Sequence, residues 1–172
     1  MEKNIVLVGF MGSGKTSVGK RLSAVLGRGF TDMDDYIEKK ENLTVTEIFA
    51  QKGEPYFRAL ERELCAEFAA GGGRIIATGG GVVKDAENVA ALKRGGIIFY
   101  LKSTPEQIAD NLKYDNTRPL LQTGDKLAKI REMMAQREKY YSGCCDVVID
   151  TAGRSIDETV EKILSCIKEE RK

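Results

Sequence analysis

Near its N-terminus, the chain contains a glycine-rich stretch whose residue types suit a polyphosphate. Residues 9–16 read GFMGSGKT, follow the apolar run Ile5–Val8, and open a helical pattern that extends to Leu26. Glycines let the backbone wrap around phosphate groups with its N–H groups pointing inward, and the helix N-terminus adds positive potential. Lys15 is placed to reach the β- and γ-phosphates, and the Thr16 hydroxyl is placed to ligate Mg²⁺.

The consensus for such a phosphate-binding loop (P-loop) fixes only four positions, so the string alone also fits a flexible glycine turn. The strand before it and the helix after it favour a nucleotide site. Gly27 follows the helix as a C-cap. The apolar face of the helix is predicted to hold Val18, Leu22, Val25 and Leu26. The predicted nucleotide-binding residues of the loop are Gly12, Ser13, Gly14, Lys15, Thr16 and Ser17.

Two carboxylates lie where the second predicted strand ends. Asp32 and Asp34 flank Met33, and strand alternation places both on one side if the strand continues through them. Near Mg-ATP, such a pair divides the work: one carboxylate holds a metal-bound water, and the other receives or orients an acceptor hydroxyl. The alternative is that Asp34 or Asp35 is only the N-cap of the helix that follows. Their position after a P-loop favours function.

Two arginines on different predicted helices are candidates for binding an anionic acceptor. Arg58 lies in the helix 55–70, one step off its core stripe, and its alternative is a surface pair with Glu61. Arg137 lies on the apolar face of the helix 126–141, where a charge needs a partner or an anionic ligand. Its alternative is a side chain that reaches the rim of the apolar face. From spacing alone, a ligand and a surface pair are equally compatible with Arg58, whereas a ligand is favoured for Arg137.

Three further features lie in predicted loops. Gly79-Gly80-Gly81 directly follows the strand 74–78, and three glycines there permit a ligand to approach the backbone closely. Arg118, in a stretch of weak periodicity, can act as an arginine finger on the transferring phosphoryl group. Arg154 follows the last strand and can lie along a nucleotide base. For both arginines, a solvated surface position is the alternative.

Five apolar strand candidates alternate with helical patterns and predict an α/β fold, a parallel sheet with helices on both faces. Ligands of such sheets bind beyond the carboxyl ends of the strands. Residues 35–70 hold several helices, more than a simple crossover needs, and residues 112–124 are aperiodic. We expect an acceptor-binding insertion and a closing lid there. The strands are predicted at 5–8, 29–33, 74–78, 97–101 and 146–150.

Composition excludes several classes of function. The 172 residues fit one domain, residues 1–172, and carry a formal net charge of +1. The chain has no basic stripe with interleaved aromatic side chains, the pattern that would indicate nucleic-acid binding. It also has no apolar run that approaches membrane-spanning length. We therefore expect a cytoplasmic monomer without nucleic-acid or membrane partners.

The chain contains no histidine, so catalysis must use carboxylates, lysine, arginine or a metal rather than a histidine-activated nucleophile. None of the four cysteines forms a C-x-x-C pair, which argues against a zinc site. We expect them to pack as small hydrophobic side chains. They are Cys65, Cys144, Cys145 and Cys166.

Taken together, these motifs make the chain closely resemble the shikimate kinases. The resemblance spans residues 9–151 in the family's order. It implies the fold of the nucleoside monophosphate kinases, with a core parallel sheet, a substrate-binding insertion and a lid. It also implies ATP-dependent phosphorylation of the 3-hydroxyl of shikimate, in chorismate and aromatic amino-acid biosynthesis. The matching residues are GFMGSGKT at 9–16, Asp32-Met33-Asp34-Asp35, Ile48-Phe49, Gly53-Glu54, Phe57-Arg58, Thr78-Gly79-Gly80-Gly81, Arg118-Pro119-Leu120-Leu121, and Arg137 with Tyr140.

On the acceptor side, the resemblance assigns one role to each matching residue. Asp34 would bind the ring hydroxyls of shikimate and help deprotonate the attacking one. Arg58 and Arg137 would hold the carboxylate. Gly80 and Gly81 would contact the ring.

On the nucleotide side, the resemblance implies that Lys15 and Arg118 stabilise the charge on the phosphoryl group. Thr16 would bind Mg²⁺ directly, and Asp32 would bind it through water. Arg154 would lie near adenine.

One position departs from the family pattern. Relatives often carry an arginine that stacks on adenine where this chain has Asn111, which bears on nucleotide affinity rather than on the reaction. Two other interpretations stay open. One is a related P-loop kinase for gluconate or a nucleoside monophosphate, although residues 35–70 show no base-reading pocket. The other is a nucleotide-binding regulator without acceptor-dependent turnover.

Overall fold

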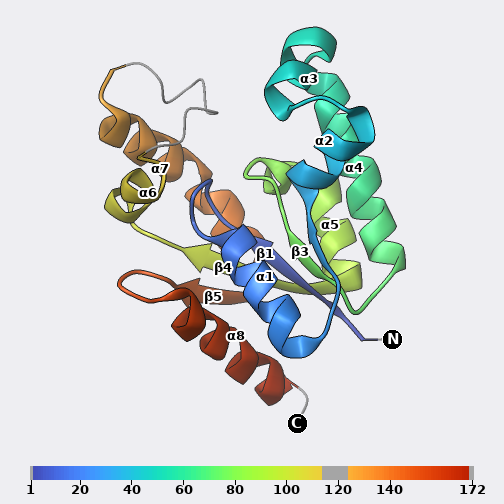
Figure 1. The fold of residues 1–172 in the computed structure, drawn as a ribbon, viewed down its shortest axis with the longest axis vertical. Helices are drawn as coiled ribbons and strands as arrows, with labels where there is room; N and C mark the ends of the chain where they lie inside the picture. The colour runs from blue at the N-terminus through green and yellow to red at the C-terminus, as the bar shows by residue number, and fades with distance from the viewer. Residues whose placement is uncertain (1, 114–123, 171–172) are drawn as a thin grey trace.

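The computed structural model describes residues 2–113 and 124–170. A five-stranded parallel sheet with the order β2-β3-β1-β4-β5 runs through its centre (Figure 1). The α/β prediction is confirmed, and each predicted strand end agrees with the structure to within one residue. The strands are β1 (Asn4–Val8), β2 (Phe30–Asp32), β3 (Ile75–Ala77), β4 (Gly96–Lys102) and β5 (Val147–Asp150).

The helices begin where the sequence supplies caps. Thr44 and Glu47 form a reciprocal capping box, and Ser155 and Glu158 make the same pair of hydrogen bonds. The Thr104 hydroxyl accepts from the Gln107 N–H at the start of another helix. The helices are α1 (Lys15–Leu26), α2 (Met33–Glu41), α3 (Val45–Lys52), α4 (Glu54–Ala70), the short 3₁₀ helix η1 (Val82–Lys84), α5 (Ala86–Gly95), α6 (Pro105–Asn111), α7 (Lys126–Cys144) and α8 (Ile156–Glu170).

Alternating side chains of β1 divide the core between the two faces of the sheet. Ile5 and Leu7 pack with buried residues of α1 and α8 on one face. Val6 and Val8 pack with buried residues of α4, α5, α6 and α7 on the other. Continuous apolar strands of this kind are buried on both faces, as parallel sheets require. One predicted core position is wrong: Val25 of α1 is 49% exposed, because it lies at the outer edge of the helix face that meets the sheet.

The predicted insertion consists of α2, α3 and α4, which connect β2 to β3. The rings of Phe49 and Phe57 join α3 to α4 with their centroids 5.0 Å apart. Figure 1 shows α2 and α3 beyond one end of the sheet, across from α6 and α7. Most of the predicted lid, residues 112–124, lies outside the described residues.

The cysteines are all free thiols. Cys65 and Cys144 are buried, which confirms the core prediction for them, and burial raises their pKa values to about 12 and about 11. Cys145 and Cys166 are only partly buried and pack at the margins of the core. None of the helices within residues 2–113 and 124–170 has both the length and the hydropathy of a membrane span.

The contact between α1 and β2 gives a stability prediction. A methyl group on Gly19 would lie 2.3 Å from the Phe30 ring, so Gly19→Ala must displace that ring. We expect Gly19→Ala to lower the free energy of unfolding by about 1–3 kcal/mol, measured by urea denaturation.

Gly143 of α7 is the matched control, because a methyl group there meets nothing within 4 Å. Gly143→Ala should stabilise the protein by about 0.5–1 kcal/mol, since alanine costs less conformational entropy in a helix. A stabilising effect of Gly19→Ala would show that α1 does not pack on β2 as described.

Candidate active site

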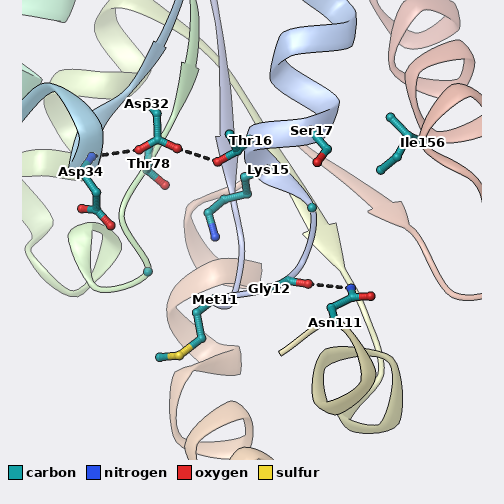
Figure 2. A pocket seen from close by; sticks show the side chains of 12 residues that line it. Met11, Gly12, Lys15, Thr16, Ser17, Asp32, Asp34, Thr78, Asn111 and Ile156 are labelled. Atoms are coloured by element: carbon teal, nitrogen blue, oxygen red, sulfur yellow. Dashed lines mark hydrogen bonds between the residues drawn. The ribbon is translucent and has the colours of Figure 1, made fainter. Parts of the chain in front are cut away.

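A cavity of about 440 Å³ opens at the carboxyl ends of the strands (Figure 2). Strand ends, the glycine loop and residues of α1, α2, α6 and α8 contribute to its wall. This is the position that parallel sheets use for ligands. The lining residues are Met11, Gly12, Gly14, Lys15, Thr16, Ser17, Asp32, Asp34, Thr78, Gly80, Asn111 and Ile156.

The glycine loop leads from β1 directly into α1. Gly12 and Gly14 have φ values of 75° and 94°, a left-handed conformation that glycine adopts without strain. No side chain caps the start of α1, and its first turn holds no acidic residue. Its first N–H groups therefore suit an anion at the cavity wall.

The Lys15 side chain is 9% exposed, and its ammonium donates to the carbonyls of Gly9 and Phe10 at 2.7 and 3.0 Å. These contacts hold the positive charge inside the curve of the loop (Figure 2). Ser13 is buried and does not line the cavity. The other predicted loop residues, 12 and 14–17, do.

Asp32 joins the end of β2 to the glycine loop. One of its carboxylate oxygens accepts a 2.5 Å hydrogen bond from the Thr16 hydroxyl, and the other accepts from the Asp34 N–H (Figure 2). The second oxygen also accepts from the Asp35 N–H. Asp32 is thus the N-cap of α2. The Thr16 hydroxyl and the Asp32 carboxylate together present hard oxygen ligands of the kind that Mg²⁺ prefers.

The structure decides two points about this segment that the sequence left open. The strand does not continue to Asp34, because Asp32 ends it and caps α2, which begins at Met33. Asp32 and Asp34 therefore reach the same cavity through a strand end and a helix start, not through strand alternation. The alternative that Asp34 or Asp35 is the cap is wrong as well, since both donate their N–H groups to Asp32.

The three glycines after β3 lie against charged side chains. A Cβ atom on Gly79 would lie 2.9 Å from Oδ1 of Asp34 and 3.1 Å from Oε1 of Glu61. Both carboxylates therefore occupy space that a side chain at position 79 would need. Glu61 is 1% exposed, and burial raises its pKa, although the Arg58 charge opposes that shift.

The next two glycines bring both candidate arginines together. A Cβ atom on Gly80 would lie 3.4 Å from Nη1 of Arg137, and one on Gly81 would lie 2.8 Å from Nη1 of Arg58. Guanidinium groups from α4 and α7 thus meet consecutive residues of one turn, beside the carboxylates at Gly79. Neither arginine lines the cavity itself, whereas Gly80 does.

Each arginine has partners that the sequence left open. Arg58 donates to Glu61 at 2.7 Å and pairs with Glu54 at 3.2 Å, so the alternative of an i+3 pair is observed. Arg137 lies over the Phe10 ring, 5.6 Å from its centroid, a distance at which a cation–π attraction operates. Both charges remain next to the glycine turn, where an incoming carboxylate can compete for them.

Some cavity residues carry no clear signal in the sequence. Ile156, at the start of α8, lines the cavity, and nothing in its neighbours predicts this. Arg154 is exposed and does not line the cavity. The Asn111 amide donates to the Gly12 carbonyl at 2.8 Å and therefore holds α6 against the glycine loop (Figure 2). Arg118 lies outside the described residues.

Comparison with known proteins identifies the family. The model of the shikimate kinase family matches residues 11–168. A shikimate kinase from Caldicellulosiruptor saccharolyticus is 44% identical over 163 residues, 95% of this chain and 94% of the relative. One from Caldanaerobacter subterraneus subsp. tengcongensis is 41% identical over 162 residues, 94% of each chain.

A solved structure agrees with these sequence matches. The shikimate kinase from Acinetobacter baumannii, in complex with shikimate, superposes with a TM-score of 0.92 at 36% identity, covering 99% of this chain and 95% of that one. The chain belongs to the shikimate kinase family, whose members are phosphotransferases acting on a hydroxyl of shikimate.

Proposed function

We propose that this protein transfers the γ-phosphoryl group of ATP to the 3-hydroxyl of shikimate, giving ADP and 3-phosphoshikimate for chorismate and aromatic amino-acid biosynthesis. The observation that carries the proposal is the arrangement around residues 79–81. A carboxylate, Asp34, and two guanidinium groups, Arg58 and Arg137, surround one glycine turn at the edge of the P-loop cavity. Shikimate presents the complementary groups, a carboxylate and a set of hydroxyls.

The acceptor binds through charge and hydrogen bonds. Arg58 and Arg137 hold its carboxylate, since planar guanidinium groups bind carboxylates strongly and with defined orientation. Gly80 and Gly81 let the ring lie against the backbone. Asp34 binds the ring hydroxyls and accepts the proton of the attacking one as the bond to phosphorus forms.

The nucleotide binds in the glycine loop, through the backbone of residues 12–17. Lys15 leaves the carbonyls of Gly9 and Phe10 and neutralises charge on the β- and γ-phosphates. Thr16 and Asp32, joined at 2.5 Å, fit a Mg²⁺ ion bound directly by the hydroxyl and through water by the carboxylate. The ion, when bound, offsets the negative charge of the phosphates.

Four further assignments belong to the same proposal. Arg118 supplies positive charge to the phosphoryl group from the segment 112–124, which acts as a lid. Arg154 contacts the adenine side of the nucleotide. Residues 35–70 form the acceptor-binding part of a single domain. The protein acts as a monomer in the cytoplasm, which fits its free thiols, since disulfides are rare in that compartment.

A panel of acceptors tests the proposal directly. ADP release with Mg-ATP is measured with shikimate, gluconate and AMP, each against a reaction without acceptor. We expect turnover with shikimate alone. Turnover with gluconate or AMP but not shikimate would favour the related kinase, and ATP binding without any acceptor-dependent turnover would favour a regulator.

Lys15→Met tests the P-loop assignment. Removing one preorganised positive donor from the phosphoryl group should lower kcat by about 10²- to 10³-fold, while circular dichroism shows an unchanged fold. Lys20→Met, on the exposed side of α1, is the matched control and should keep wild-type activity. Full activity of Lys15→Met would contradict the site.

Arg137→Ala tests the acceptor site. Loss of a charge-assisted hydrogen bond should raise the KM for shikimate about 10- to 100-fold and leave the KM for ATP nearly unchanged. Arg131→Ala is the control on the same helix, because that arginine is exposed and pairs with Glu106 at the surface. Equal increases in both KM values for Arg137→Ala would refute the role of the arginine.

A further inference from the structure

Tyr141 of α7 is a buried polar residue that the assignments above do not use. Its side chain is 2% exposed, and its hydroxyl donates a 2.7 Å hydrogen bond to the carbonyl of Gly80. A tyrosine that only filled the core would leave its hydroxyl in need of a partner. Here that partner is the glycine that lines the cavity.

The Gly80 carbonyl differs from its neighbours in how it is held. The carbonyls of Gly79 and Gly81 accept from the backbone N–H groups of Val82 and Lys84, only three residues further along the chain. The Gly80 carbonyl instead accepts from a side chain that is 61 residues away in the sequence. Because a peptide group is planar, this bond fixes the orientation of the whole amide between Gly80 and Gly81.

The same hydroxyl lies beside the arginine assigned to the acceptor. Arg137 lies one helical turn before Tyr141, and a Cβ atom on Gly80 would lie 3.4 Å from Nη1 of Arg137 and 3.9 Å from the Tyr141 hydroxyl. Burial raises the pKa of the Tyr141 hydroxyl, and the charge of Arg137 opposes that shift. The hydroxyl therefore stays protonated near neutral pH and donates to Gly80 next to the Arg137 charge.

A second tyrosine provides a natural comparison. The rings of Tyr100 and Tyr141 stack with their centroids 5.3 Å apart and an interplanar angle of 24°, and both residues are buried. The Tyr100 hydroxyl, however, donates to Glu138 at 2.5 Å rather than to the glycine turn. The two tyrosines share their packing and differ in what their hydroxyls hold.

We propose that Tyr141 is a positioning residue for the acceptor, whose hydroxyl holds the Gly80 carbonyl beside the Arg137 guanidinium, in the arrangement that binds the substrate carboxylate. This inference rests on the proposed function, because it needs Arg137 and Gly80 in the acceptor site. Tyr141 itself does not touch the acceptor. Phenylalanine at this position keeps the ring and loses the hydrogen bond to the Gly80 carbonyl.

The test compares Tyr141→Phe with Tyr100→Phe in steady-state kinetics with shikimate and ATP. For Tyr141→Phe we expect the KM for shikimate to rise about 5- to 30-fold, as loss of one buried hydrogen bond implies, with the KM for ATP within twofold of wild type. Tyr100→Phe should leave both KM values within twofold of wild type. An equal rise in both KM values for Tyr141→Phe would overturn the proposal and show that Tyr141 only packs in the core. The same rise in the KM for shikimate in Tyr141→Phe and Tyr100→Phe would overturn it as well.

A double-mutant cycle with Arg137→Ala tests the link to the arginine. If Tyr141 acts through Arg137, Tyr141→Phe should raise the KM for shikimate less in the Arg137→Ala background than in the wild type. Fully additive effects would overturn the link. Wild-type turnover with shikimate and an unchanged acceptor KM in Tyr141→Phe would sink this inference alone, whereas no wild-type turnover with shikimate would sink the proposed function as well.

Discussion

Because residues 79–81 are glycines, charged groups can lie directly against the backbone of this turn at the edge of the P-loop cavity. Any Cβ atom at these positions would enter space next to Asp34, Arg137 or Arg58. Because the turn is bare, α2, α4 and α7 can each bring a charge to it, although these helices are far apart in the sequence. The result is a small region of backbone with two carboxylates next to Gly79 and a guanidinium group next to each of Gly80 and Gly81. Such a region suits an acceptor with one acid group and several hydroxyls.

Strand order places this turn beside the nucleotide. β1 lies between β3 and β4, so the glycine loop that follows β1 and the glycine turn that follows β3 leave the same edge of the sheet side by side. β2 is next to β3, and Asp32 at its end reaches back to Thr16. One sheet edge therefore holds the phosphate site, the hydroxyl–carboxylate pair and the acceptor turn. Phosphoryl transfer depends mainly on such positioning and on charge stabilisation.

Local patterns predicted the strands, the P-loop and the Gly27 cap of α1, because each depends on residues close in the sequence. The end of β2 was harder. A strand that continues and a helix that begins both fit Asp32-Met33-Asp34, and the choice depends on which side chain caps. Long-range contacts left weaker signals. Arg58 was equally compatible with a Glu61 pair and with a ligand, and the structure places it next to both the pair and the glycine turn. Ile156 reaches the cavity only through the packing of α8, and Tyr141 resembled an ordinary member of an apolar stripe.

The most direct test of this account is a crystal structure of the protein with shikimate and a non-hydrolysable ATP analogue. The account predicts that the shikimate carboxylate lies within hydrogen-bonding distance of both guanidinium groups, Arg58 and Arg137, with its ring against Gly80 and Gly81 and a hydroxyl on Asp34. A carboxylate bound elsewhere, with either arginine still engaged only by protein groups, would contradict it.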